Sequence, residues 1–391
     1  MFPVETRALV RDLSASRIRE VANAGFGQND ILKFWFGESN RQTPDYIRHA
    51  AISAISEGRT FYTHNNGNAD LRLALSGYLS GLHGQVIGPN RISVTSSGVS
   101  ALMLAMQALL DPGDRVLLVT PVWPNVAEIP RILSADLVRF PLRPGPAGWQ
   151  LDLDAFLAAI TPQTRLVIIN SPSNPAGWTL PAGNRRAILE HCRRLGVWLL
   201  CDDVYERLHF DPARRSAPSF FEIADPEDRL IGVNSFSKAW LMTGWRLGWI
   251  VAPGGLEADF GKLIEYNTSC TPDFIQAAGL TAIREGEPHI AALREDLRAK
   301  RDLVVDRLTQ LPDVDLHPPA GGMYVFFRIG GHADSVALAK QLIAEARIGL
   351  APGAAFGPEG EGWLRWCIAA DHADLSAGLD RLSSWLAGAK R

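Results

Sequence analysis

The sequence predicts a doubly wound α/β domain with a mostly parallel sheet, together with a smaller α+β domain. Between about residues 95 and 253, short apolar segments alternate with helical patterns, and after that region the pattern changes. A length of 391 residues also favours two domains, because single hydrophobic cores seldom grow beyond about 300 residues. We expect an N-terminal segment over 1–40 that packs with the small domain, a large domain over 41–284 and a small domain over 285–391.

Four segments of the large domain are predicted to be strands buried on both faces of a sheet. Each is a continuous apolar run, which is typical of parallel strands covered by helices on both sides. The four segments are residues 115–120 (RVLLVT), 165–170 (RLVIIN), 197–202 (VWLLCD) and 230–235 (LIGVNS).

A helix is predicted directly after Gly98. Apolar side chains recur there with the spacing of one helical face, and the turn "LDPGD" ends the pattern. The apolar positions are Val99, Leu102, Met103, Met106, Leu109 and Leu110.

The C-terminal region has the pattern of an α+β domain. A charge-rich amphipathic helix is followed by a strand, a second helix, two short strands and a closing helix. We expect these elements at 290–311, 321–329, 334–346, 348–351, 363–369 and from about Asp374 onward.

The composition is that of an ordinary globular protein, with 47% hydrophobic and 21% charged residues. The net charge of −3 gives no indication of nucleic-acid binding. We expect no membrane span, no signal peptide and no metal site, and we expect a cytoplasmic protein. The four cysteines form no metal-ligand pattern and are expected to be reduced: Cys192, Cys201, Cys270 and Cys367.

Polar segments follow four of the predicted strands. In open α/β sheets, ligands bind outside the carboxyl ends of the strands, so these segments should meet at one edge of the sheet. They are "SSGVS" (96–100), "NSPSNPAG" (170–177), "DDVY" (202–205) and "SFSK" (235–238).

The first of these segments has the features of an anion site. Ser96, Ser97 and Gly98 precede a helix whose free N–H groups and dipole favour negative charge. Arg246 and the hydroxyls of Ser235 and Ser237 could complete it. An ordinary N-cap serine and a surface salt bridge are the alternative interpretations.

The other polar groups also have two interpretations each. Asp202 either caps a helix or holds a heterocyclic nitrogen protonated, with Tyr205 nearby as a donor to an oxyanion. Trp123 either packs in the core or stacks on a flat ring. Lys238 is either a solvated surface lysine or an amine whose pKa is lowered by its neighbours, which makes it a nucleophile toward aldehydes. Together, the functional interpretations describe a site for pyridoxal phosphate.

The chain resembles the fold-type I, class I/II aminotransferases, and within them the bacterial aspartate/aromatic-type subgroup. "SFSKAWLMTGWRLGW" is similar to the family's cofactor-lysine signature, "NSPSNPAG" to its N-x-P-x-N-P-x-G motif and "DDVY" to its D-x-x-Y motif. The resemblance extends from residues 18–25 to residues 363–369. It implies a pyridoxal 5′-phosphate enzyme that moves an amino group from an α-amino acid to a 2-oxo acid in a ping-pong cycle.

The resemblance also implies a role for each matching residue around the cofactor ring. Lys238 would form the Schiff base and shuttle the proton. Asp202 would pair with the pyridine nitrogen, Tyr205 and Asn174 would bond the phenolic oxygen, and Trp123 would stack on the ring.

Further roles concern the phosphate and the second subunit. The backbone of Gly98 and Val99, with Ser235 and Arg246, would hold the phosphate, and Ser97 is a weaker candidate. Tyr62 matches a tyrosine that reaches this phosphate from the other subunit of a homodimer.

Three residues are implied in substrate binding. Arg365 matches the arginine that clamps the α-carboxylate with its planar fork. The backbone of Gly37 would lie over the substrate, and Asn174 would contact it.

The sequence departs from the aspartate-using members of the subgroup at two places. Those enzymes carry a lysine for the side-chain carboxylate where this chain has Val99, and "GESN" replaces the usual G-E-P-D. We therefore expect a neutral aliphatic or aromatic amino donor, with 2-oxoglutarate or pyruvate as acceptor. A replacement charge could come from Arg17, Arg19 or His64.

Three rival functions have different signatures. A β-eliminating C–S lyase shares the fold and most motifs, and it would release ammonia and a keto acid without an acceptor. A non-catalytic effector-binding domain of a transcription regulator would carry a DNA-binding module, and no helix-turn-helix pattern fits here. A nicotinamide dehydrogenase would need a GxGxxG motif after a strand, which this sequence lacks.

Overall fold

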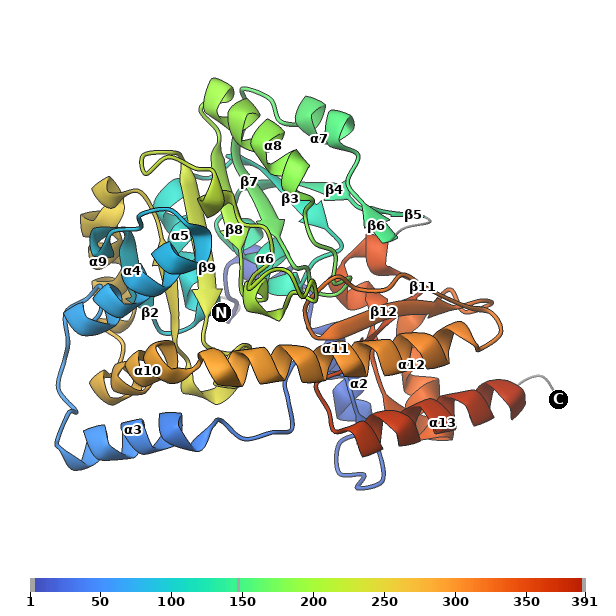
Figure 1. Cartoon of the computed structure of the whole chain (residues 1–391). Coiled ribbons are helices and arrows are strands. Elements are labelled where there is room, and N and C mark those ends of the chain that lie inside the picture. Colours follow the sequence, from blue (N-terminus) through green and yellow to red (C-terminus); the bar gives the residue numbers. More distant parts are fainter. Residues whose placement is uncertain (1–3, 146–147, 389–391) are drawn as a thin grey trace.

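A seven-stranded sheet forms the centre of the computed structural model, which describes residues 4–145 and 148–388 (Figure 1). Its strand order is β2-β10-β9-β8-β7-β3-β4. The pairs from β9 to β4 are parallel, whereas β10 runs antiparallel to both of its neighbours. The strands are β2 (Ile92–Thr95), β3 (Arg115–Thr120), β4 (Asp136–Pro141), β7 (Thr164–Asn170), β8 (Trp198–Asp202), β9 (Leu230–Ser235) and β10 (Gly248–Val251).

Helices cover both faces of this sheet, which confirms the doubly wound α/β prediction. Successive strand residues belong to opposite cores, as Val167 and Ile168 do. One core contains helices α5 (Gly98–Leu109), α6 (Pro124–Ile132) and α9 (Glu257–Thr268). The other contains α4 (Ala69–His83), α7 (Leu153–Ala159), α8 (Ala182–Leu195) and α10 (Asp273–Glu285).

A second, antiparallel sheet of four strands lies in the C-terminal region, with the order β11-β12-β15-β14. Long helices α11 and α13 run beside it in Figure 1. The elements are α11 (Glu287–Thr309), β11 (Val314–Leu316), β12 (Tyr324–Ile329), α12 (Ser335–Gln341), β13 (Ile348–Gly349), β14 (Ala351–Pro352), β15 (Trp363–Cys367) and α13 (His372–Gly388).

One expected element differs in detail. The helix expected over 334–346 is α-helical only to Gln341, and a π-helical turn follows over Leu342–Ala346. The turn ends at Arg347, whose left-handed backbone (φ 57°) leads directly into β13.

The N-terminal segment lies against the C-terminal region. Strand β1 (Leu32–Lys33) pairs in parallel with β13, and α2 (Arg17–Ala24) packs near β14. The exact division at residues 40 and 284 stays a prediction. The remaining α-helices and β-strands are α1 (Ala8–Arg11), α3 (Asp45–Ser56), β5 (Arg143–Gly145) and β6 (Gly148–Gln150).

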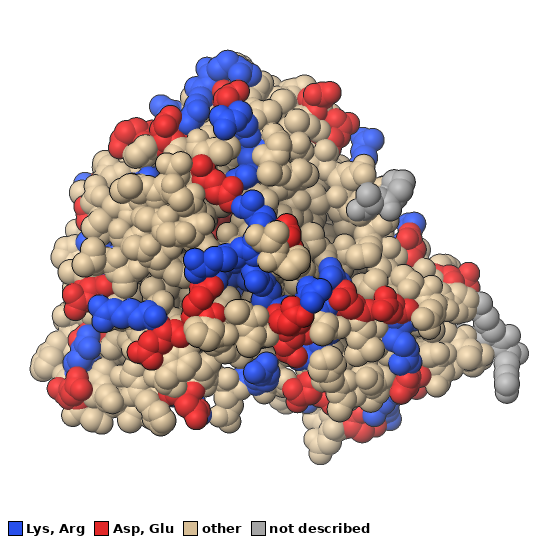
Figure 2. Space-filling model, viewed as in Figure 1, with Lys and Arg blue, Asp and Glu red and all other residues tan. Residues whose placement is uncertain are grey.

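The surface carries mixed charge on the face shown in Figure 2, where acidic and basic side chains are interspersed. Ion pairs of the molecule include Arg193 with Asp228, and the buried Arg207 with Glu287. Among residues 4–145 and 148–388, no helix is both long and apolar enough to cross a membrane.

Candidate active site

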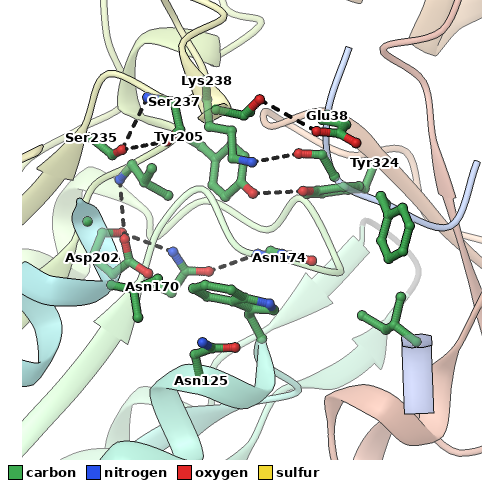
Figure 3. Close-up of a pocket in the computed structure, with 18 of the residues that line it drawn as sticks. Glu38, Asn125, Asn170, Asn174, Asp202, Tyr205, Ser235, Ser237, Lys238 and Tyr324 are labelled. Atoms are coloured by element: carbon green, nitrogen blue, oxygen red, sulfur yellow. Dashed lines mark hydrogen bonds between the residues drawn. The ribbon is translucent and has the colours of Figure 1, made fainter. Parts of the chain in front are cut away.

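A cavity of about 530 Å³ opens at the carboxyl edge of the central sheet (Figure 3). The register of the sheet explains why polar groups meet there, since Asn170 at the end of β7 lies opposite Asp202 at the end of β8. The sequence-predicted residues that line this cavity are Gly37, Gly98, Val99, Trp123, Asn174, Asp202, Tyr205, Ser235, Lys238, Arg246 and Arg365.

Ser96, Ser97, Arg17 and His64 were also named as candidates and lie outside the cavity wall, and so does Tyr62. Its side chain is 88% exposed, and its neighbour in the chain, Phe61, is 81% exposed. Such exposure is unusual for two adjacent aromatic rings.

Lys238 follows β9 and projects into the cavity. Its Nζ donates a hydrogen bond of 2.6 Å to the carbonyl oxygen of Gly37, which belongs to the N-terminal segment. Burial lowers the pKa of Lys238 from 10.5 to about 8, and the positive charges of Arg365 and Arg246 act in the same direction. A larger fraction of this amine is therefore neutral near physiological pH than in an ordinary lysine, as a nucleophile or general base requires.

Asp202 is a buried carboxylate without a cationic partner. Its Oδ1 accepts a long hydrogen bond of 3.4 Å from the N–H of Val204, and it forms no ion pair within the part of the chain that the structure describes. Burial raises the pKa of Asp202 to about 7, although the positive charge of Lys238 opposes this shift. Such a group favours a positively charged ligand atom beside it.

Arg365 is the converse case, a buried guanidinium without an acidic partner among residues 4–145 and 148–388. It is 2% exposed and donates to Asn174 Oδ1 at 2.8 Å and to the carbonyl oxygen of Trp35 at 2.6 Å. Its Nε has no acceptor. A buried charge is costly unless it is paired, so this arginine suits a carboxylate ligand.

The N-terminus of α5 forms the third charged part of the wall. Gly98 lets this end approach β9 closely, because a Cβ there would lie 3.0 Å from the Cβ of Ser235. Arg246 also faces the cavity and donates to the carbonyl oxygen of Thr243 at 2.6 Å. Free backbone N–H groups and a guanidinium together make a suitable site for a phosphate.

The serines of the predicted anion site have different surroundings. Ser97 caps α5, since its Oγ accepts from the N–H of Ser100 at 3.0 Å, and Ser96 bonds Thr268. Ser235 Oγ lies 2.9 Å from Ser237 Oγ, and both of these residues line the cavity. The N-cap interpretation therefore holds for Ser97.

Some residues of the wall were not predicted as site residues. Tyr324 is buried, and its Oη lies 2.8 Å from Tyr205 Oη. The sequence marks this residue only as part of an apolar strand, so no polar signal indicated it. Asn170 begins a motif that was recognised, and it positions Asn174 by accepting the N–H of that residue at 2.8 Å. Asn125 and Glu38 also line the cavity. Asn125 lies two residues after Trp123 and Glu38 directly follows Gly37, but no spacing in the sequence singled them out.

Residues 25–382 match the family model for aminotransferase class I and II. The chain belongs to this family. It is 32% identical to the aspartate aminotransferase of Pyrococcus horikoshii over 97% of this chain and 96% of that one. It is 34% identical to the arginine–pyruvate transaminase of Pseudomonas aeruginosa over 86% and 85%. The solved aromatic aminotransferase from Pyrococcus horikoshii superimposes with a TM-score of 0.85 at 30% identity, covering 95% and 99%.

This aminotransferase is thus a fold-type I enzyme that depends on pyridoxal 5′-phosphate. The cavity fits that cofactor on physical grounds. The unpartnered carboxylate of Asp202 suits a protonated ring nitrogen, the end of α5 with Arg246 suits a phosphate, and Lys238 supplies an amine of lowered pKa. When bound, the cofactor withdraws electrons from the α-carbon of an attached amino acid.

Proposed function

We propose that this aminotransferase takes the amino group of a neutral aliphatic or aromatic amino acid and passes it to a 2-oxo acid. The observation that carries the proposal is Val99 in the cavity wall, where the aspartate-using members of the subgroup have a lysine. A valine cannot form an ion pair with a side-chain carboxylate. Apolar residues also line this cavity: Ile18, Trp35, Phe36 and Leu102.

The proposed roles of the charged residues follow from their surroundings. Arg365 holds the α-carboxylate of the substrate, because it is a buried guanidinium with an unsatisfied Nε. Lys238 Nζ removes the α-proton as general base and later returns it. Asp202 keeps the ring nitrogen protonated, since its buried negative charge favours a cation beside it.

The remaining proposed contacts orient the cofactor. Tyr205 and Asn174 contact the phenolic oxygen, and Trp123 stacks on the ring. The phosphate is held by the backbone of α5 at its first two residues, Gly98 and Val99. The side chains of Ser235 and Arg246 complete the phosphate site, as their place in the cavity wall supports.

For the acceptor, we propose 2-oxoglutarate in preference to pyruvate. Of the three candidate replacement charges, Arg17 pairs with Glu20 at 2.8 Å, and His64 Nδ1 accepts from the N–H of Asn66 at 3.2 Å. Arg19 lines the cavity, and its guanidinium lies over the ring of Phe36 at 5.7 Å. It has no ion-pair partner within residues 4–145 and 148–388, so a second carboxylate would give it one.

A test of the acceptor compares Arg19→Ala with the matched control Arg17→Ala. We expect Arg19→Ala to raise the KM for 2-oxoglutarate about tenfold, the size of one lost charged hydrogen bond, and to leave the KM for pyruvate unchanged. Arg17→Ala should alter neither. Equal effects of Arg19→Ala on both acceptors would contradict the proposal.

The names of the relatives do not agree on one substrate, since they include aspartate, aromatic and arginine–pyruvate enzymes. They agree on amino-group transfer, which does not favour the C–S lyase alternative.

The donor specificity is tested by kcat/KM for leucine, methionine, phenylalanine and aspartate, in the wild type and in Val99→Lys. We expect the wild type to prefer the neutral donors and the variant to gain activity toward aspartate. A wild type that prefers aspartate would refute the proposal.

We also propose a homodimer in which Tyr62 reaches the cofactor phosphate of the partner subunit. The rings of Phe61, Tyr62 and Tyr266 are exposed, the last of them at 90%, and this supports a surface that a second subunit covers.

A further inference from the structure

Tyr324 occupies a central place among the proposed catalytic groups without belonging to any recognised motif. It begins β12 and is 1% exposed, yet its hydroxyl lies at the cavity wall. Figure 3 shows this hydroxyl beside that of Tyr205, with 2.8 Å between the two oxygens. The two rings meet edge to face, with their centroids 5.7 Å apart.

Two further groups of the site pack directly on Tyr324. The guanidinium of Arg365 lies 4.3 Å above the centre of its ring. A Cβ on Gly37 would lie only 2.0 Å from the Tyr324 oxygen, so the close approach requires a glycine there. The same Gly37 accepts the hydrogen bond of Lys238 at its carbonyl. Tyr324 therefore contacts both the N-terminal segment and the carboxylate-binding arginine.

The direction of the hydroxyl–hydroxyl bond follows from proton counting. A tyrosine hydroxyl has one proton to donate, and it can accept at its oxygen. If Tyr205 donates its proton to an oxygen of the cofactor, then the bond to Tyr324 requires Tyr324 to be the donor.

The electrostatics favour the same direction. Burial raises the pKa of both hydroxyls, but the pKa of Tyr324 reaches only about 12, because the positive charge of Arg365 and the bond to Tyr205 oppose the rise. The pKa of Tyr205 is also raised well above its ordinary value, chiefly by burial and in part by its contact with Tyr324. The positive charge of Arg365 lies over the ring of Tyr324, which makes the hydroxyl of Tyr324 a better donor.

We propose that Tyr324 is a positioning residue whose hydroxyl donates to Tyr205 and so directs the proton of Tyr205 to the phenolic oxygen of the cofactor. This inference rests on the role proposed above for Tyr205. Tyr324 need not touch the cofactor to act in this way. Loss of its hydroxyl weakens and misdirects the bond that Tyr205 makes, but it leaves the aromatic ring beneath Arg365.

The test uses the holoenzyme and the pH titration of the visible absorbance band of its cofactor. Tyr324→Phe, Tyr205→Phe and the double variant are compared with wild type. We expect Tyr324→Phe to shift the midpoint in the same direction as Tyr205→Phe by about half a pH unit, as one weakened hydrogen bond would. The double variant should titrate like Tyr205→Phe alone, because Tyr324 acts only through that residue.

Two controls separate positioning from a general structural effect. Tyr78→Phe removes the hydroxyl of a half-buried tyrosine that accepts a hydrogen bond from Arg207 away from the cavity, and it should leave the midpoint unchanged. The KM of the amino donor should change less than twofold in Tyr324→Phe, because Arg365 keeps its aromatic neighbour.

Three results would overturn the inference. The first is an unchanged midpoint in Tyr324→Phe. The second is a double variant whose shift equals the sum of the two single shifts, which would mean independent action. The third is an unchanged midpoint in Tyr205→Phe, which would also remove the role proposed for Tyr205. Amino-group transfer is measured separately, so its failure is distinguishable from each of these.

Discussion

At the scale of single residues, the site is defined by charges that lack partners. Asp202 and Arg365 are both buried, and neither forms an ion pair within residues 4–145 and 148–388. Leaving such groups unpaired destabilises the fold, which is characteristic of functional sites.

The first prediction concerns the pH dependence of stability in the cofactor-free protein. Because burial raises the pKa of Asp202 from 3.8 to about 7, the folded chain holds a proton that the unfolded chain releases between these values. This contribution to stability is fully present below about pH 4 and is lost as the pH rises through 7. At pH 8, Asp202→Asn should therefore be more stable than wild type by on the order of 3 kcal/mol.

Urea denaturation at pH 4 and pH 8 measures this difference. The two proteins should be nearly equally stable near pH 4, where the wild-type carboxyl is protonated in the folded chain and about half protonated in the unfolded chain. A variant that is less stable than wild type at pH 8 would show that the ionised carboxylate does not destabilise the cofactor-free fold. With cofactor bound, the same variant should lose most of its turnover.

The second prediction concerns Arg365. Lysine in its place keeps the positive charge but loses the planar guanidinium. The guanidinium can bond Asn174 and the Trp35 carbonyl and still present N–H groups to a substrate carboxylate. We expect Arg365→Lys to raise the KM for the amino donor about tenfold to a hundredfold, which corresponds to about 1.4–2.8 kcal/mol. Steady-state kinetics at a fixed acceptor concentration measure it, and an unchanged KM would mean that the carboxylate binds elsewhere.

At the scale of elements, the strand ends and the start of α5 create the cavity. The runs at 115–120 and 230–235 coincide with β3 and β9, because strands buried on both faces leave a continuous apolar signal. The helix expected after Gly98 is α5, which begins at that glycine.

The third prediction concerns the approach of α5 to β9. A Cβ at Gly98 would be only 3.0 Å from the Ser235 side chain, so Gly98→Ala should push the helix end away from the proposed phosphate site. We expect the Kd of the cofactor to rise about tenfold or more, measured by titration of the cofactor-free protein.

Gly77→Ala in α4 is the matched control, because its Cβ would meet nothing within 4 Å. It should leave the cofactor Kd unchanged and stabilise the protein by about 0.5–1 kcal/mol through its helix propensity. A similar loss of affinity in both variants would contradict the proposed role of Gly98.

Other features of the structure could not be predicted from the sequence. Strand β10 inserts antiparallel between β2 and β9, and no local pattern in "GWIV" indicates that direction. Tyr324 was missed for a related reason, since its proposed role arises from contacts with Tyr205 and Arg365, which are distant in sequence. Tertiary contacts of this kind leave no trace in spacing or composition.

At the scale of the whole molecule, the cavity brings together the N-terminal segment, the central sheet and the antiparallel sheet. Gly37, Lys238 and Arg365 come from these three parts respectively. The sequence predicted this meeting only through family resemblance, because the residues are separated by most of the chain. The cytoplasmic location stays a prediction.

The fourth prediction concerns the proposed homodimer. We expect light scattering to give twice the mass of the chain, and Tyr62→Phe to weaken cofactor binding about fivefold without changing that mass. Tyr266→Phe is the control, because this equally exposed tyrosine has no proposed contact with the cofactor. A monomer with full activity would exclude the proposed contribution of Tyr62 from a second subunit.

The most direct measurement is the visible spectrum of the purified enzyme after single amino acids are added without any acceptor. We predict that leucine, methionine or phenylalanine removes the absorbance band of the bound cofactor, that aspartate does so much less readily, and that 2-oxoglutarate then restores it. No ammonia should be released. A band that persists while ammonia and a keto acid accumulate would contradict amino-group transfer, and a band that responds best to aspartate would contradict the proposed donor class.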